Sequence, residues 1–127
     1  MIIGASSGIG KACAIQFAKL GFRCILTARR IELLEEIRST YIPDSTIHKM
    51  DLCKQEEAVS IFQKLCHEVD SVDIVLISAG TGAINKNLEW QLEKHTIDLN
   101  VSGFTAIADA AANYFIERKA GPLAAIS

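Results

Sequence analysis

Gly4-Ala5-Ser6-Ser7-Gly8-Ile9-Gly10 is the stretch that decides the fold, because it separates an apolar start, Met1-Ile2-Ile3, from a segment with helical spacing. Gly4 can adopt a turn conformation that a side chain would penalise. Gly8 and Gly10 leave room for a diphosphate against the first helical turn, where unpaired N–H groups and the positive end of the helix dipole favour an anion. A strand, a glycine loop and a helix in this order predict a dinucleotide-binding site.

Two hydroxyl groups lie inside this glycine loop. Ser6 and Ser7 can both donate hydrogen bonds to phosphate oxygens. For Ser7 a second interpretation stays equally open, because serine is also a favoured N-cap residue.

Composition narrows the class of protein. Half of the 127 residues are apolar and the formal net charge is −2, as in an ordinary globular chain. The length suffices for a core, so we expect residues 1–127 to form one dinucleotide-binding domain. The charge balance disfavours a nucleic acid or an anionic membrane as partner. No apolar run approaches the roughly 20 residues that cross a bilayer, and the start lacks the features of a secretory signal.

The cysteines form no metal-binding or disulfide pattern. Cys13, Cys24, Cys53 and Cys66 contain no Cys-x-x-Cys pair and have no histidine at ligand spacing. We therefore expect free thiols, no metal site and a reducing cytoplasm.

Strand and helix signals alternate along the chain. We expect strands at 2–3, 22–27, 46–50, 73–78 and 122–127, and helices at 9–20, from 33 to before Pro43, at 58–69 and, as a pair, between 90 and about 118. In the first helix Ile9, Cys13, Phe17 and Leu20 share one apolar face. The continuous apolar run at 73–78 is typical of a strand buried on both faces. This alternation predicts an α/β Rossmann fold, a doubly wound parallel sheet of about five strands in the order 3-2-1-4-5.

Ligands of such sheets bind beyond the carboxyl ends of the strands. Arg29 and Arg30 follow the second strand, where an NAD site usually has an acidic residue for the ribose hydroxyls; the first acid, Glu32, already lies in the helix. Two guanidinium groups suit a 2′-phosphate, and one charge-assisted bond is worth about 1.5–3 kcal/mol. We therefore expect NADP rather than NAD. The alternative is a solvated helix start, which the dipole disfavours for arginine.

Three further positions follow strands or interrupt a helix. Asp51 can accept a hydrogen bond from an adenine amino group while Leu52 packs on the ring, but Asp51 could equally cap the next helix. Ala79 and Gly80 are small enough for a ribose to lie against the backbone, or belong to a flexible loop. Asn100 either bends its helix and binds water or caps the second of two helices.

Together these residues resemble the short-chain dehydrogenase/reductase family. Residues 4–10 resemble its Thr-Gly-x-x-x-Gly-x-Gly motif, although Ile3 replaces the threonine that braces the loop. Arg29 falls at the phosphate-selecting position of the NADP-preferring members, and Asp51 matches the adenine-side aspartate. Residues 77–80 match only the second half of the Asn-Asn-Ala-Gly motif. Asn100 falls on the helix asparagine that, in the family, binds a water linked to the catalytic lysine.

The resemblance implies an NADP-dependent oxidoreductase that transfers a hydride between NADP(H) and a small carbonyl or alcohol substrate. The implied cofactor-binding residues are Gly4, Ser6, Ser7, Gly8, Ile9, Gly10, Arg29, Arg30, Asp51, Leu52, Ala79 and Gly80, and the implied catalytic residue is Asn100. The family's Tyr-x-x-x-Lys pair is missing, since Ser45 follows Tyr41 and Arg118 follows Tyr114 at that spacing. Ser127 matches the first serine of the family's Ser-Ser. We therefore expect the amino-terminal half of an enzyme, truncated at the fifth strand and inactive by itself.

Two other functions stay open. One is a non-catalytic dinucleotide-binding or sensor protein on the same fold; the other is a methyltransferase, in which Arg29 would stand where that class has an acid. The stretch 101–115 is apolar on more than one face, which is typical of a deeply buried helix or a subunit contact. Family members use this helix in dimers and tetramers, so we expect a homodimer or homotetramer.

Overall fold

The computed structural model describes residues 1–126, and five parallel strands form the centre of this part of the chain. The strands are β1 (Ile2–Ile3), β2 (Ile25–Ala28), β3 (Thr46–Lys49), β4 (Val75–Ile77) and β5 (Leu123–Ala125). Their order, β3-β2-β1-β4-β5, confirms the predicted doubly wound sheet. The chain adds β2 and β3 on one side of β1 and then crosses to the other side to add β4 and β5. Ligands of such sheets bind at this switch point, between the ends of β1 and β4. Ser127, the predicted counterpart of a family serine, lies outside the described residues.

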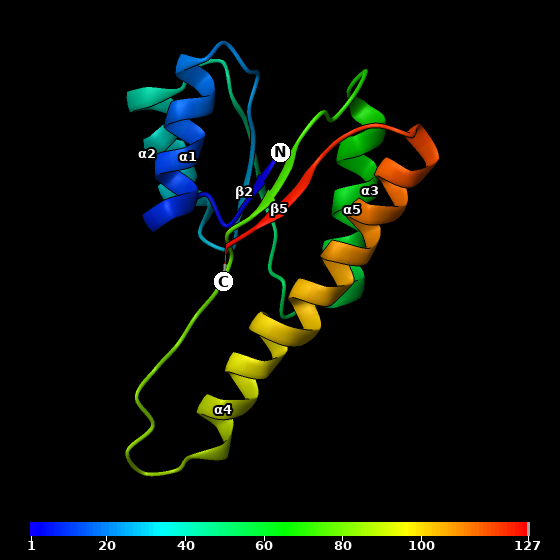
Figure 1. The fold of residues 1–127 in the computed structure, drawn as a ribbon. Coiled ribbons are helices and arrows are strands. Elements are labelled where there is room, and N and C mark those ends of the chain that lie inside the picture. The colour runs from blue at the N-terminus through cyan, green and yellow to red at the C-terminus, as the bar shows by residue number, and fades with distance from the viewer. Residues whose placement is uncertain (127) are drawn as a thin grey trace.

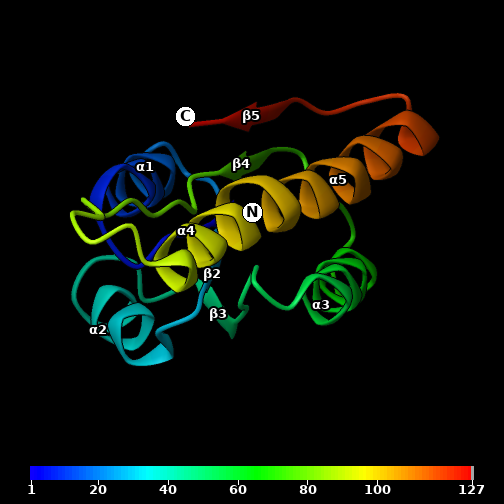
Figure 2. The same ribbon diagram turned by 90° about the horizontal axis from the view of Figure 1, so that it is seen from below.

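Helices cover both faces of the sheet (Figures 1 and 2). On one face lie α1 (Gly8–Lys19) and α2 (Ile31–Tyr41), and on the other lie α3 (Gln55–Glu68) and α5 (Phe104–Arg118). Successive strand residues point to opposite faces, so Ile2 joins the α1–α2 core while Ile3 joins the α3–α5 core. Both faces of β1 and β4 are therefore buried, as a parallel sheet requires.

The apolar face predicted for the first helix is only partly correct. The side chains of Ile9 and Leu20 are 55% and 74% exposed, whereas Gly10 and Ala14 are the buried residues of α1. At Gly10 a Cβ would lie 2.2 Å from the Gly4 carbonyl oxygen. The helix therefore approaches the sheet along its smallest residues, which an analysis of apolar periodicity does not detect.

The second strand is shorter than predicted at its start. It begins at Ile25, because Phe22 is 44% exposed and packs edge-on against Phe17 of α1, with ring centroids 5.5 Å apart. The loop before β2 therefore covers the end of α1 instead of extending the sheet.

The helical stretch after β4 is continuous instead of forming two helices. α4 (Trp90–Ile97) runs into a π-helical segment, η1 (Asp98–Gly103), and then into α5. Figure 1 shows this long rod with α4 projecting beyond the sheet. At Gly103 a Cβ would lie 2.3 Å from the Leu52 carbonyl oxygen, so the widened turn packs tightly on the loop after β3. The interpretation of Asn100 as a cap is wrong, because the helix does not break there.

No helix within residues 1–126 combines the length and the apolar character needed to span a membrane.

Candidate functional site

A cleft of about 390 Å³ lies at the carboxyl ends of β1 to β4. Its walls contain every expected cofactor-binding residue except Gly10, namely Gly4, Ser6, Ser7, Gly8, Ile9, Arg29, Arg30, Asp51, Leu52, Ala79 and Gly80. Gly10 instead lies beneath the loop, where it lets α1 approach Gly4. Sequence reasoning did not assign six lining residues to the site: Ile3, Ala28, Met50, Ser78, Leu99 and Ile126. Ile126 follows β5, so the strand-end rule could have found it, whereas nothing in the sequence distinguishes Leu99 from a core residue.

The glycine loop is held by backbone bonds to the neighbouring strand. The N–H groups of Gly4 and Ala5 both donate to the Thr27 carbonyl oxygen, at 2.9 and 3.0 Å. They brace the loop even though Ile3 lacks the hydroxyl group of the family's threonine. Gly4 has φ +89, and a Cβ there would lie 2.4 Å from the Ala79 nitrogen. Position 4 therefore requires glycine for two reasons: its positive φ, as predicted, and the lack of room for a Cβ.

The start of α1 has the features of an anion site. Ser7 occupies the N-cap position, but its hydroxyl group caps nothing, and the first turn contains no acidic residue. Gly8 has φ +55, and a Cβ there would meet no protein atom within 4 Å. The first N–H groups of the helix and the two serine hydroxyls thus border open space, where the helix dipole favours negative charge.

Two cations stand at the end of β2. Arg29 and Arg30 are both exposed, and within residues 1–126 neither forms an ion pair. Arg29 lies near enough to Cys53 for its charge to act on that thiol, which places it toward the loop after β3. Unpaired guanidinium groups beside an uncapped helix start make this side of the cleft positive.

Asp51 borders the cleft but does not cap α3. The N-cap of α3 is Lys54, and Asp51 instead accepts a hydrogen bond from the Cys53 N–H through Oδ1 at 3.1 Å. The capping alternative is therefore wrong, and the Asp51 side chain faces the residue two positions later instead of the helix start. Leu52 is only 3% exposed beneath η1, so it forms the wall of the cleft rather than a projecting platform.

Asn100 joins η1 to the loop after β4. Its Nδ2 donates to the Thr81 carbonyl oxygen at 2.7 Å, and its Oδ1 accepts from the Thr81 N–H at 2.9 Å. The side-chain amide is thus engaged with the backbone that follows Ala79 and Gly80. The water-binding role implied by the resemblance stays a prediction.

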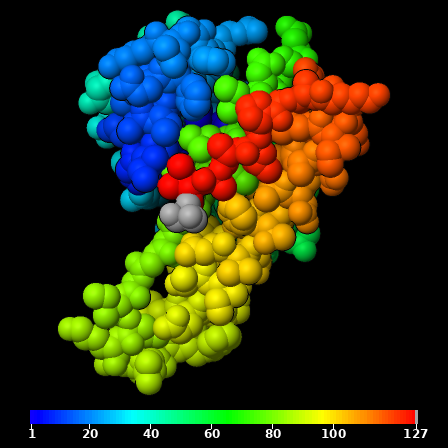
Figure 3. Space-filling view, viewed as in Figure 1, coloured from blue at the N-terminus to red at the C-terminus, as the bar shows by residue number. Residues whose placement is uncertain are grey.

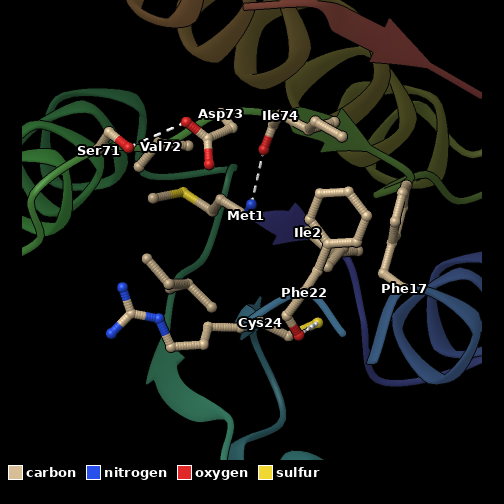
Figure 4. Close-up of a pocket in the computed structure, with 11 residues that line it drawn as sticks. Met1, Ile2, Phe17, Phe22, Cys24, Ser71, Val72, Asp73 and Ile74 are labelled. Carbon is tan, nitrogen blue, oxygen red and sulfur yellow. Dashed lines mark hydrogen bonds between the residues drawn. The ribbon is translucent and has the colours of Figure 1, made fainter. Parts of the chain in front are cut away.

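A second pocket lies at the opposite, amino ends of the strands (Figure 4). Met1, Phe17, Phe22 and Cys24 line it, and the Met1 ammonium group donates to the Ile74 carbonyl oxygen at 2.7 Å. Its volume is about 60 Å³, far below the several hundred Å³ of typical ligand sites. Within residues 1–126, no three His, Cys, Asp or Glu side chains are grouped so that they could hold a metal ion. The cleft at the carboxyl ends is the candidate site because the loops that follow four parallel strands converge on it.

Comparisons with known proteins show the family of the chain. A family model described as short chain dehydrogenase matches residues 1–127. An uncharacterized oxidoreductase of Myxococcus xanthus is 30% identical over 132 residues, which cover 100% of this chain and 52% of the relative. An uncharacterized oxidoreductase of Listeria monocytogenes is 33% identical, covering 100% of this chain and 53% of that protein.

A solved structure shares the fold of this chain. An alcohol dehydrogenase from the archaeon Thermococcus sibiricus, complexed with 5-hydroxy-NADP, superposes with a TM-score of 0.87 at 27% identity. The match covers 98% of this chain and 55% of that one. The chain thus spans about half the length of the curated relatives that it matches.

Proposed function

The chain belongs to the short-chain dehydrogenase/reductase family, and we propose that its cleft binds NADP(H) for an oxidoreductase acting on a small carbonyl or alcohol substrate. One observation carries the proposal: the unpaired Arg29 and Arg30 stand beside the uncapped start of α1 in a single cleft. The archaeal alcohol dehydrogenase complexed with an NADP derivative supports it.

The donors of the cleft match the groups of a phosphorylated dinucleotide. A pyrophosphate needs N–H donors and space, which Gly8, Ser6 and Ser7 provide. A 2′-phosphate needs a cation, and a guanidinium group can bind phosphate oxygens in a bidentate manner. The volume of about 390 Å³ falls within the range of small-molecule sites.

When bound, the nicotinamide supplies the hydride chemistry, and this chain binds and orients the cofactor. The two tyrosines do not act in the cleft. Tyr114 accepts a hydrogen bond from the Val72 N–H at 2.9 Å, and Tyr41 lies under the Lys11 ammonium group on the α1–α2 side. Neither has a lysine four residues later. We therefore propose that residues 1–127 bind NADP(H) without turning over substrate, and a carbonyl-dependent NADPH oxidation by this chain would contradict that.

The structure offers a matched pair of charge reversals to test the cofactor preference. Arg29 lines the cleft after the carboxyl end of β2, whereas Arg23 precedes the amino end of β2 and lines the small second pocket. Isothermal titration should give NADP⁺ at least tenfold tighter binding than NAD⁺, since one charge-assisted bond is worth about 1.5–3 kcal/mol. Arg29→Asp should reverse that order, and Arg23→Asp should preserve it. Equal affinities of the wild type for the two cofactors would contradict the proposal.

Two further parts of the proposal concern the intact protein. Exposed apolar residues on α4 and η1, such as Ile97 and Val101, support self-association as a homodimer or homotetramer. The four free cysteines favour a reducing compartment such as the cytoplasm.

A further inference from the structure

One cysteine, next in sequence to Leu52 in the wall of the cleft, lies against an imidazole. The Cys53 Sγ is 3.6 Å from the His95 Nδ1, although 42 residues separate the two in sequence. Cys53 belongs to the loop after β3 and His95 to α4, and each side chain is partly exposed. The projecting α4, seen as the arm of Figure 3, thus brings a base to a thiol.

The other three thiols are in different surroundings. Cys24 and Cys66 are buried, and burial raises the pKa of the Cys66 thiol to about 11. Cys13 on α1 is partly exposed like Cys53, but within residues 1–126 it has no hydrogen-bonding side-chain partner. Cys13 is therefore a natural internal control for Cys53.

The groups around Cys53 change the pKa of its thiol and therefore its reactivity. Partial burial, the carboxylate charges of Asp51 and Asp98, and a hydrogen bond to the Asp51 side chain raise the pKa of its thiol, and the Arg29 charge opposes them. Lys94 pairs with Asp98 and weakens that carboxylate's influence. The thiol is therefore protonated near neutral pH, and a nearby base that removes its proton sets its reactivity.

We propose that Cys53 and His95 form a thiol–disulfide exchange site for small disulfides, and that the resulting mixed disulfide blocks the adenosine end of the cleft. The blocking part rests on the proposed NADP(H) function, whereas the exchange part stands on the Cys53–His95 geometry alone. The Cys53 thiol itself lies beside the Asp51 carboxylate, with which it shares a side-chain hydrogen bond, so a group added to this thiol lies next to the residue expected to meet the adenine.

The exchange is balanced. His95 Nδ1 accepts the thiol proton, and the Cys53 sulfur attacks one sulfur of the disulfide, forming a new S–S bond while the original S–S bond breaks. The leaving thiolate takes the proton from the imidazolium. One thiol is consumed and one released, so no oxidant beyond the disulfide is required, and excess thiol reverses the reaction.

The exchange is tested with 5,5′-dithiobis(2-nitrobenzoate), whose released thiolate is coloured, and with peptide mass spectrometry to assign the adducts. Cys53 should react at least tenfold faster than Cys13 at pH 7, as compared between the Cys13→Ser and Cys53→Ser variants. His95→Gln should slow the reaction of Cys53 about tenfold at pH 7 and leave that of Cys13 unchanged. The two rates at Cys53 should converge at alkaline pH, where the thiol ionises without a base.

Equal rates at Cys53 and Cys13 would overturn the exchange site, as would an unchanged Cys53 rate in a folded His95→Gln variant. If circular dichroism shows that His95→Gln is unfolded, the comparison of Cys53 with Cys13 decides alone.

Blocking is tested by titrating NADP⁺ into the mixed disulfide. The adduct should weaken binding at least tenfold, and Cys53→Ser treated with the same reagent should bind as before, since serine keeps the backbone N–H that meets Asp51. Equal affinity with and without the adduct would overturn the blocking. If the unmodified chain does not bind NADP⁺, the proposed function and the blocking are both contradicted. The exchange rates at Cys53 and Cys13 then still test the exchange site by themselves.

Discussion

Gly8 and Gly21 resemble each other in conformation and in open space, and differ in their position relative to the cleft. Both have positive φ, +55 and +88, and a Cβ at either position would meet no protein atom within 4 Å. Gly8 borders the cleft at the start of α1, whereas Gly21 follows the other end of that helix. Alanine therefore adds similar backbone strain at both positions, but only at Gly8 does its methyl group enter the candidate site.

We expect Gly8→Ala and Gly21→Ala each to lower the free energy of unfolding by about 1 kcal/mol, the cost of a left-handed conformation for a residue with a Cβ. Only Gly8→Ala should weaken NADP⁺ binding, by tenfold or more. Urea denaturation measures the first effect and calorimetric titration the second. Equal binding by the two variants would mean that no ligand approaches Gly8.

For single residues, the sequence predicted which of them lie near the cleft better than it predicted what each of them does there. Gly4 was expected in a turn conformation, and both its φ and its contact with Ala79 agree. Gly10 was expected near the phosphates, yet it serves the packing of α1 on Gly4. Ser7 and Asp51 each had two possible roles that only hydrogen-bond geometry separates, because a spacing in sequence does not show where an oxygen points.

Asn100 is the point at which the π-helical segment and the loop after β4 are fixed to each other. The nitrogen and the oxygen of its side-chain amide both bond to the backbone of Thr81, one residue beyond Gly80. Asn113 is also exposed, lies on the same rod within α5, and makes no side-chain hydrogen bond within residues 1–126. It is therefore a matched control for removal of the amide.

Asn100→Ala should speed amide hydrogen exchange at Thr81 by about fivefold, since a net hydrogen bond is worth about 1 kcal/mol and local opening scales with that loss. Asn113→Ala should leave Thr81 unchanged, because it removes no bond to this loop. NMR-detected exchange measures both. An unaltered Thr81 rate in Asn100→Ala would show that other contacts hold the loop.

At the element scale, alternation of strand and helix signals was sufficient for the sheet, but not for the long helix. Most of the strands follow from apolar runs, although β3 contains a single apolar residue, Ile47, and their order follows from right-handed connections. The sequence suggested two helices between 90 and 118, because the polar Asn100 interrupts an apolar stretch. The structure keeps one continuous rod by widening a turn at Asp98–Gly103, which depends on the tertiary contact of Gly103 with Leu52.

On the scale of the molecule, the same rod leaves apolar side chains uncovered. Ile97 and Val101 are 45% and 57% exposed, while Ile107 further along is fully buried on the sheet. A helix that is apolar on two sides needs a second partner. Leu20, 74% exposed on α1, offers an apolar position away from this surface.

Sedimentation of the intact protein should therefore show a dimer or tetramer. Val101→Glu should shift it toward monomer, because a charge in an apolar contact loses its hydration. Leu20→Glu should leave the assembly intact. A wild-type protein that sediments only as a monomer would contradict this prediction.

The cleft itself is a product of the whole molecule. Its residues come from loops that lie far apart in the sequence, after β1, β2, β3 and β4, and the parallel sheet brings them to one edge. The sequence could predict these loops because parallel strands all end on that side. It could not predict Leu99 of η1, whose place depends on how the rod packs.

The most direct test is an NMR titration of the ¹⁵N-labelled 13.8 kDa chain with NADP⁺. The backbone amides of Gly8, Ile9, Arg29 and Asp51 should shift most, and omission of the 2′-phosphate, by use of NAD⁺, should diminish the shift at Arg29 selectively. Shifts confined to the opposite edge, around Phe17 and Phe22, or no shifts at all, would contradict the assignment of this cleft to the cofactor.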